Sequence, residues 1–102
     1  MTGTEKQIAY ASSLLELFTE SYNTEITENA DAAEYTGKLA AQRDQVIAWA
    51  NEADAGKIIL WFKGMGRTAD FMIARSLYKK WDANQRLRAR CAENEARKAG
   101  QQ

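Results

Sequence analysis

The 102-residue chain contains no histidine, no proline and only one cysteine, Cys91. Without histidine it lacks the commonest zinc ligand and the commonest general base, so neither a Ser/His/Asp nor a Cys/His catalytic arrangement can form. A single cysteine also excludes an internal disulfide and a metal cluster held by cysteines alone. We therefore expect a protein with no enzymatic activity, no metal site and no cofactor.

Long apolar segments are absent as well. The longest apolar run, "IILWF" at 58–62, falls far short of the roughly 18 residues that a membrane span needs. The first residues, "MTGTEKQ", have neither the basic start nor the apolar stretch of a signal peptide. We expect a cytoplasmic protein that does not enter a membrane.

Net charge is zero, but the charges are unevenly distributed along the chain. Residues 1–56 carry 3 basic and 10 acidic side chains, a net charge of −7, whereas the remainder carries 11 basic and 4 acidic side chains, a net charge of +7. Such asymmetry indicates a charged partner, or two halves that face one another within one fold. Charge by itself fits both interpretations.

The absence of proline, together with glycines near the expected helix ends, favours an all-α fold. A chain of this length forms one domain, and its periodicity predicts a small bundle of about four helices spanning residues 1–102. The expected helices cover residues 5–22, 31–53, 55–63 and 68–98, with a loop over the polar segment 23–31. Segment 58–62 could instead be a buried strand, but no second segment is available to pair with it.

Apolar residues at helical spacing predict the buried faces of these helices. They are Ile8, Ala11, Leu15, Phe18 and Tyr22 in the first helix; Ala32, Tyr35, Leu39, Val46, Trp49 and Ala53 in the second; Ala55, Ile58, Ile59 and Phe62 in the third; and Phe71, Ala74, Leu77, Tyr78 and Trp81 in the fourth.

Helix ends are predicted from polar residues and glycines. The expected N-caps are Thr4, which has capping-box spacing with Gln7, Asp54 and Thr68. Gly64 is expected to take the left-handed position at the end of the third helix, and Gly37 indicates a close contact between helices.

The fourth helix would be about 46 Å long at 1.5 Å per residue, which exceeds the width of a domain of this size. Beyond Asp82 its apolar stripe thins to Leu87 and Cys91. Residues 85–102 are therefore expected to project from the domain, to pack on a second copy or to be partly disordered, and the terminal "AGQQ" is predicted to be disordered.

One candidate site is the glycine turn of "FKGMGRTAD". It contains the parts of an anion site, namely a glycine-rich turn, two cations and the start of a helix. The residues concerned are Lys63, Gly64, Gly66 and Arg67. A bare G-x-G between two helices matches neither a P-loop nor a dinucleotide motif, and a simple turn between helices is the favoured interpretation.

A second candidate is the basic part of the fourth helix, which could follow a phosphate backbone while Tyr78 and Trp81 stack on bases. The basic residues assigned to it are Lys79, Lys80, Arg86, Arg88 and Arg90. The three arginines of this set do not form one stripe along a helix. A solvated helix with the two aromatics in the core therefore explains the basic residues equally well.

A third candidate is an acidic set that could bind a partner protein by imitating nucleic-acid phosphates, could hold cations, or could simply be solvated. Its members are Glu16, Glu20, Glu25, Glu28, Asp31 and Glu34. No calcium-loop motif accompanies them.

Two segments carry a resemblance. "TEKQIAYASSLL" from Thr4 to Leu15, followed by "DAGKIILWFKG" from Asp54 to Gly64, resembles a two-part pattern of small phage- and plasmid-borne proteins: T-E-K-Q-I-x-[YF]-A, then an aspartate-capped helix with paired isoleucines. Some small anti-CRISPR proteins are similar over the first segment. The resemblance implies a mobile-element origin and a shared helical packing unit. Its residues are mostly cap and core positions, so it assigns no functional residue.

From these features we expect a non-enzymatic inhibitor or adaptor that binds a host protein, such as a CRISPR effector or another enzyme of the nucleic-acid machinery. The alternative is an accessory protein that binds nucleic acid through its basic C-terminal helix. A monomer is favoured over a homodimer, because a basic helix repels its own copy in a parallel pair.

Overall fold

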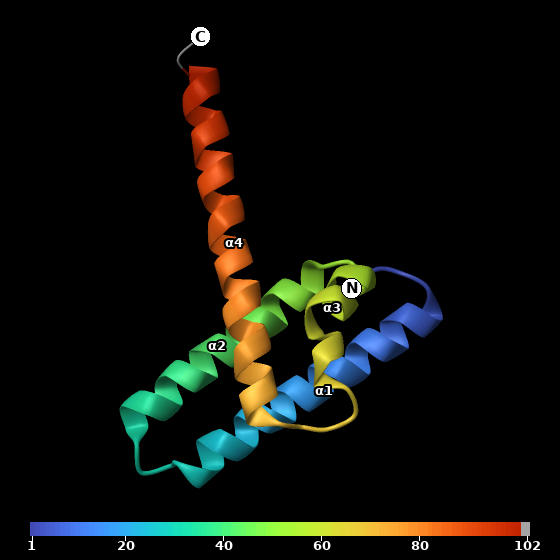
Figure 1. Ribbon diagram of the computed structural model, residues 1–102, viewed down its shortest axis with the longest axis vertical. Coiled ribbons are helices and arrows are strands. Elements are labelled where there is room, and N and C mark those ends of the chain that lie inside the picture. The colour runs from blue at the N-terminus through green and yellow to red at the C-terminus, as the bar shows by residue number, and fades with distance from the viewer. Residues whose placement is uncertain (101–102) are drawn as a thin grey trace.

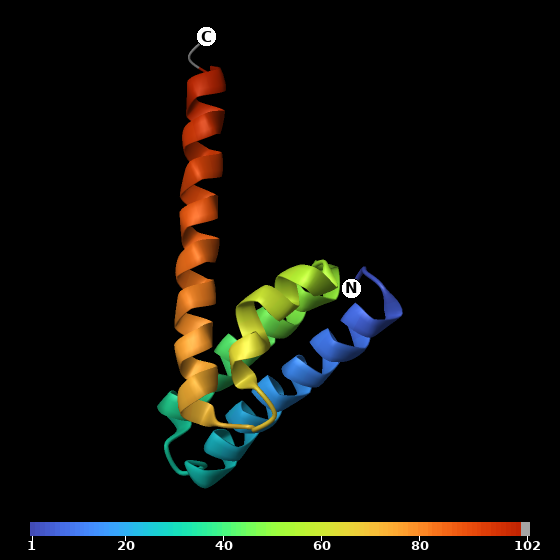
Figure 2. The same cartoon turned by 45° about the vertical axis from the view of Figure 1, so that its right-hand side comes forward.

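A computed structural model describes residues 1–100 and confirms the small all-α bundle. Its elements are α1 (Glu5–Glu28), α2 (Ala33–Glu52), α3 (Ala55–Phe62), the short 3₁₀ turn η1 (Lys63–Met65) and α4 (Phe71–Gly100). The helices α1 and α2 run antiparallel, and α4 stands steeply across them (Figures 1 and 2). Within residues 1–100 the only β pairing is an isolated bridge between Thr2 and Asp54. Segment 58–62 is therefore helical, as expected.

Two of the three predicted caps are confirmed. At α1, the Gln7 backbone N–H donates to Thr4 Oγ1 at 3.2 Å, and the Thr4 N–H donates to Gln7 Oε1 at 3.1 Å. At α3, Asp54 Oδ1 accepts from the Gly56 N–H at 3.1 Å. These bonds satisfy backbone donors that have no partner inside a helix, which is why the sequence signals were reliable.

The predicted loop over 23–31 is wrong for residues 23–28, because α1 continues to Glu28. Ile26, the only large apolar residue of the segment, packs against the core. Thr27 donates its hydroxyl to the Asn23 carbonyl at 2.9 Å, and the Asn29 side chain donates to the Glu25 carbonyl at 2.8 Å. Tertiary packing and these local bonds therefore keep a polar segment helical.

The cap of α4 also differs from the prediction. Asp70, rather than Thr68, precedes the helix, and its Oδ1 accepts from the backbone N–H groups of Met72 at 2.9 Å and Ile73 at 3.3 Å. Both residues are good N-caps by type, so the sequence could not distinguish them. Asp70 is the cap because the helix begins directly after it, whereas Thr68 lies in the preceding turn and donates its own N–H to the Met65 carbonyl.

Two glycine predictions were wrong. Gly66, with φ of +63°, takes the left-handed conformation predicted for Gly64. Gly64 serves close packing instead, because a Cβ there would lie 3.1 Å from Leu77 Cδ2. The predicted close contact at Gly37 does not exist, since a Cβ at that position would meet nothing within 4 Å.

The core is an aromatic cluster contributed by all four helices. Phe18 of α1 lies 4.6 Å from Tyr22 and 5.2 Å from Phe62 of α3, measured between ring centroids. Trp49 of α2 approaches Phe62 at 6.4 Å and Trp81 of α4 at 5.5 Å. The predicted buried faces are largely confirmed, and the buried aromatic rings contribute large areas of apolar contact to the core.

Two buried tyrosines connect the helices through glutamines of α2. The Tyr22 hydroxyl donates to Gln42 Oε1 at 3.0 Å, and the Tyr78 hydroxyl of α4 donates to Gln45 Oε1 at 2.8 Å. Burial, and next the nearby Tyr78, raise the pKa of Tyr22 well above its usual range. Burial, followed by the Asp82 carboxylate, raises the pKa of Tyr78.

These tyrosines predict alkaline destabilisation. Because the pKa of Tyr22 is higher in the folded state than the ordinary value of 10.0 in the unfolded chain, its contribution is complete below about pH 10 and is lost as pH rises further. The free energy of unfolding should fall by up to about 1.4 kcal/mol per pH unit for this group. Urea denaturation between about pH 8 and 11 measures it. Tyr22→Phe should lower the starting stability but flatten the decline; a slope identical to that of the wild type would contradict this assignment.

The second half of α4 extends away from the other helices (Figures 1 and 2). Every residue from 86 to 100 is exposed, whereas Ala74, Tyr78 and Trp81 of the first half are buried. The molecule measures 54 × 38 × 18 Å, with α4 along its longest dimension. Of the segment predicted to be disordered, Ala99 and Gly100 belong to α4, and residues 101 and 102 lie outside the described residues.

Truncation after Asn84 should leave a folded helical domain. The removed part of α4 is exposed from residue 86 onward, so the free energy of unfolding should change by no more than about 1 kcal/mol. Circular dichroism should show a helical protein with a cooperative urea transition. A truncated chain that is unfolded would mean that the removed segment stabilises the bundle.

Candidate functional site

An open groove of about 750 Å³ lies between α1 and α2. We call it the acidic groove; its lining residues are Leu15, Glu16, Thr19, Glu20, Asn23, Thr24, Thr27, Glu28, Ile47, Ala50 and Asn51. Its lining includes two larger aliphatic side chains, Leu15 and Ile47, and the buried Ala50. The described lining residues include three carboxylates and no cation. The groove therefore has a negative potential over an apolar floor.

The acidic groove follows directly from the length of α1. Glu16, Glu20, Thr24 and Glu28 recur every four residues, and this spacing places them along one face of a helix. A second row, offset by one residue, supplies the remaining α1 lining. The spacing was readable in the sequence, but the expected loop after residue 22 interrupted it, and the floor contributed by α2 required the tertiary structure.

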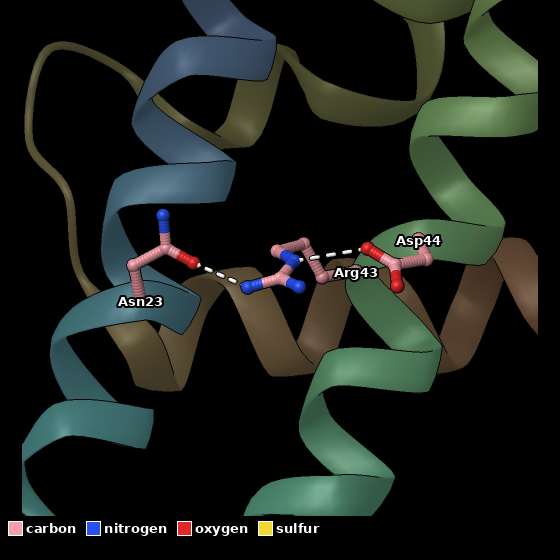
Figure 3. Close-up of polar contacts among 3 residues, drawn as sticks. All are labelled: Asn23, Arg43 and Asp44. Atoms are coloured by element: carbon pink, nitrogen blue, oxygen red, sulfur yellow. Dashed lines mark hydrogen bonds and ion pairs between the residues drawn. The ribbon is translucent and has the colours of Figure 1, made fainter.

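Arg43 of α2 lies close to the groove without lining it. Its Nη1 donates to Asn23 Oδ1 on α1 at 2.7 Å, and its Nε donates to Asp44 Oδ1 at 3.1 Å (Figure 3). The guanidinium therefore connects the two helices while its charge is offset by the neighbouring carboxylate. This contact fixes the position of one groove residue, Asn23.

The structure brings together only part of the predicted acidic set. Glu16, Glu20 and Glu28 line the acidic groove. The other three members lie elsewhere: Glu25 is half-buried and accepts from the Tyr35 hydroxyl at 3.1 Å, Asp31 is exposed in the turn before α2, and Glu34 forms an exposed ion pair with Lys38 at 3.8 Å. Three residues therefore carry the candidate site.

The glycine turn places its two cations on the surface, but its backbone donors are used internally. Gly66 donates its N–H to the Lys63 carbonyl at 3.1 Å, and Asp70 occupies the N-terminus of α4. Gly66 and Arg67 share a small hollow with Glu16 and Glu20 of α1. Two carboxylates beside one guanidinium weaken the positive potential that an anion would need.

The basic residues of α4 also separate in space. Arg86 is exposed and pairs with Asp82 at 3.1 Å, whereas Arg88 faces the body of the molecule and lines a hollow with Glu52, Asp54 and two tryptophans. Lys79, Lys80 and Arg90 are exposed. Tyr78 and Trp81 are buried in the core, so neither can stack on a base in this conformation.

Sequence reasoning missed a different row of cations. Arg75, Lys79, Arg86, Arg90 and Arg97 recur at intervals of four and seven residues and therefore share one face of α4, on which Asp82 and Glu93 also lie. The hollow containing Arg88, of about 340 Å³, was also missed, because its tryptophans Trp49 and Trp61 come from different helices and Trp49 was assigned to the core.

Two absences complete the description. Residues 1–100 contain no cluster of three or more histidine, cysteine, aspartate or glutamate side chains that could hold a metal ion. No helix in that range is both long and apolar enough to cross a membrane.

Comparison of the chain with protein-family models, curated proteins and solved structures finds no match.

Proposed function

We propose that this protein is a non-enzymatic inhibitor from a mobile element, which binds a protein of the host's nucleic-acid machinery in an anti-CRISPR-like manner. The observation that carries the proposal is the acidic groove, where Glu16, Glu20 and Glu28 of α1 stand beside aliphatic lining residues. Proteins that handle nucleic acid have basic surfaces for phosphates, and a row of carboxylates is complementary to such a surface. The resemblance of residues 4–15 to small phage-borne proteins supports the same role.

The floor of the groove makes this proposal more specific than charge alone. Exposed carboxylates by themselves contribute little affinity, because water and salt screen them. Aliphatic side chains beside the carboxylates allow a partner to bury apolar surface in the same contact that pairs the charges. A partner with arginines or lysines around an apolar side chain fits this arrangement.

Affinity purification from a bacterial lysate tests the proposal. The tagged chain should recover a nuclease, a CRISPR effector or another nucleic-acid enzyme, and the purified pair should show inhibition of that enzyme. Binding should weaken as salt rises from about 50 to 500 mM, since screening shortens the reach of the carboxylates. Recovery of no nucleic-acid enzyme, or of one whose activity is unchanged, would contradict the proposal.

Direct binding of nucleic acid by α4 is the second candidate, favoured by the exposed row of cations on one face of that helix. Each neutralised phosphate contributes roughly 0.9 to the slope of log affinity against log salt. Changing Arg86 and Arg90 together to alanine should reduce this slope by about two, whereas Arg88→Ala, which faces the body, should change it less. Absence of DNA or RNA binding at about 50 mM salt would remove this candidate.

A further inference from the structure

The exposed end of α4, residues 86–100, has one face of small apolar side chains and an adjoining face of charged ones. Its alanines recur at intervals of three and four residues and form one small, smooth face: Ala89, Ala92, Ala96 and Ala99. On the adjoining face lie Arg86, Arg90 and Arg97, with Glu93 between the last two. Five cations and two carboxylates give this segment, which we call the tail, a net charge of +3.

The acidic groove matches the tail in charge and length. Its lining carries three carboxylates, opposite in sign to the net charge of the tail, although Arg67 lies beside Glu16 and Glu20. It extends along α1 from Leu15 to Glu28, about 20 Å at 1.5 Å per residue, and the tail measures about 21 Å by the same rise. Small alanine side chains allow a helix to approach an apolar floor closely, and the flanking arginines then reach the carboxylates of the rim.

The spacing of the charges also agrees. Glu16 and Glu20 are four residues apart, as are Arg86 and Arg90. The next carboxylate, Glu28, follows after eight residues, and the next cation on that face, Arg97, follows after seven. Two helices lying side by side and parallel therefore place all three pairs at similar heights, where each pair attracts.

A tail cannot reach the groove of its own chain, because α4 is a continuous helix that extends away from α1 and α2 (Figures 1 and 2). We infer that the tail of one copy docks in the acidic groove of a second copy. The inference does not depend on the proposed function, although a docked tail would cover the groove that the proposed partner uses. Because the contact is small and screened by salt, the dimer should be weak, forming at about 0.01–1 mM protein.

Charge exchange in the full-length chain tests the inference. Sedimentation of the wild type at about 50 mM salt should show a monomer–dimer equilibrium. The groove variant Glu16→Lys/Glu20→Lys and the tail variant Arg86→Glu/Arg90→Glu should each raise the dissociation constant by at least about tenfold. An equimolar mixture of the two variants should dimerise again, since the opposite charges are restored. The control Asp31→Lys/Glu34→Lys changes the same charge outside the groove and should dimerise like the wild type.

Cys91 supplies a second readout of where the tail lies. It is the only cysteine and is exposed in the tail, so it accepts a nitroxide label without other changes. Labelled chain mixed with ¹⁵N-labelled chain should broaden the amide signals of Thr24 and Thr27 in the second copy, but not those of residues outside the groove.

Three outcomes would overturn the inference. The wild type could remain monomeric up to about 1 mM, the two variants could fail to associate when mixed, or the label could broaden signals away from the groove. Loss of partner binding by the groove variant in a strictly monomeric protein would assign the groove to the partner alone. Conversely, the tail variant should abolish the dimer and leave capture of a basic partner intact, which separates this inference from the proposed function.

Discussion

Replacement of Phe18 by alanine is expected to lower the free energy of unfolding by about 3–5 kcal/mol. The ring is fully buried and contacts Tyr22 of its own helix and Phe62 of α3. Its removal leaves a cavity where these two helices meet, and rigid aromatic neighbours cannot move to fill it. Small domains are stable by only about 5–15 kcal/mol, so the variant should unfold at a much lower urea concentration.

The control for this experiment is Leu60→Ala. Leu60 lies on α3, close in sequence to Phe62, but its side chain is 61% exposed. Its removal should change stability by about 0.5 kcal/mol or less. Similar losses for the two variants would mean that α3 does not present Phe62 to α1, and the core described above would be wrong.

Reversing two charges of the acidic groove should weaken the proposed partner by about 100-fold or more. In Glu16→Lys/Glu20→Lys, two cations face the basic surface of the partner, and like charges in contact cost several kcal/mol at an interface. Both side chains are exposed, so the fold should be retained and circular dichroism should match that of the wild type. Isothermal titration calorimetry or inhibition of the captured enzyme measures the effect.

The matched control is Asp31→Lys/Glu34→Lys, which makes the same change in net charge on the same half of the chain. Both residues are exposed outside the groove, and the ion pair that Glu34 loses with Lys38 is a solvated one. Its affinity should stay within a few-fold of the wild type. Equal losses in the two variants would show that the partner senses overall charge rather than the groove.

Where a local signal was unambiguous, the sequence predicted the structure. The Thr4–Gln7 capping box, the Asp54 cap and the apolar stripes of the helices depend on residues within one or two turns of each other, and the structure confirms them. Errors arose where local signals were ambiguous. Thr68 and Asp70 are both good caps, and the polar segment 23–28 resembles a loop until Ile26 packs against the core.

By itself, the sequence therefore determined the fold class, the main buried faces and the segregation of charge, because periodicity and capping are properties of short segments. Only the tertiary structure decided how the charges are grouped. The pairing of α1 with α2 supplies the floor beside Glu16, Glu20 and Glu28. Glu25 does not line the groove and instead accepts a hydrogen bond from Tyr35. The tertiary structure also places Arg88 beside the body of the molecule, while the rest of the tail extends into solvent. Such groupings join residues that are distant along the chain, and no local pattern encodes their separation in space.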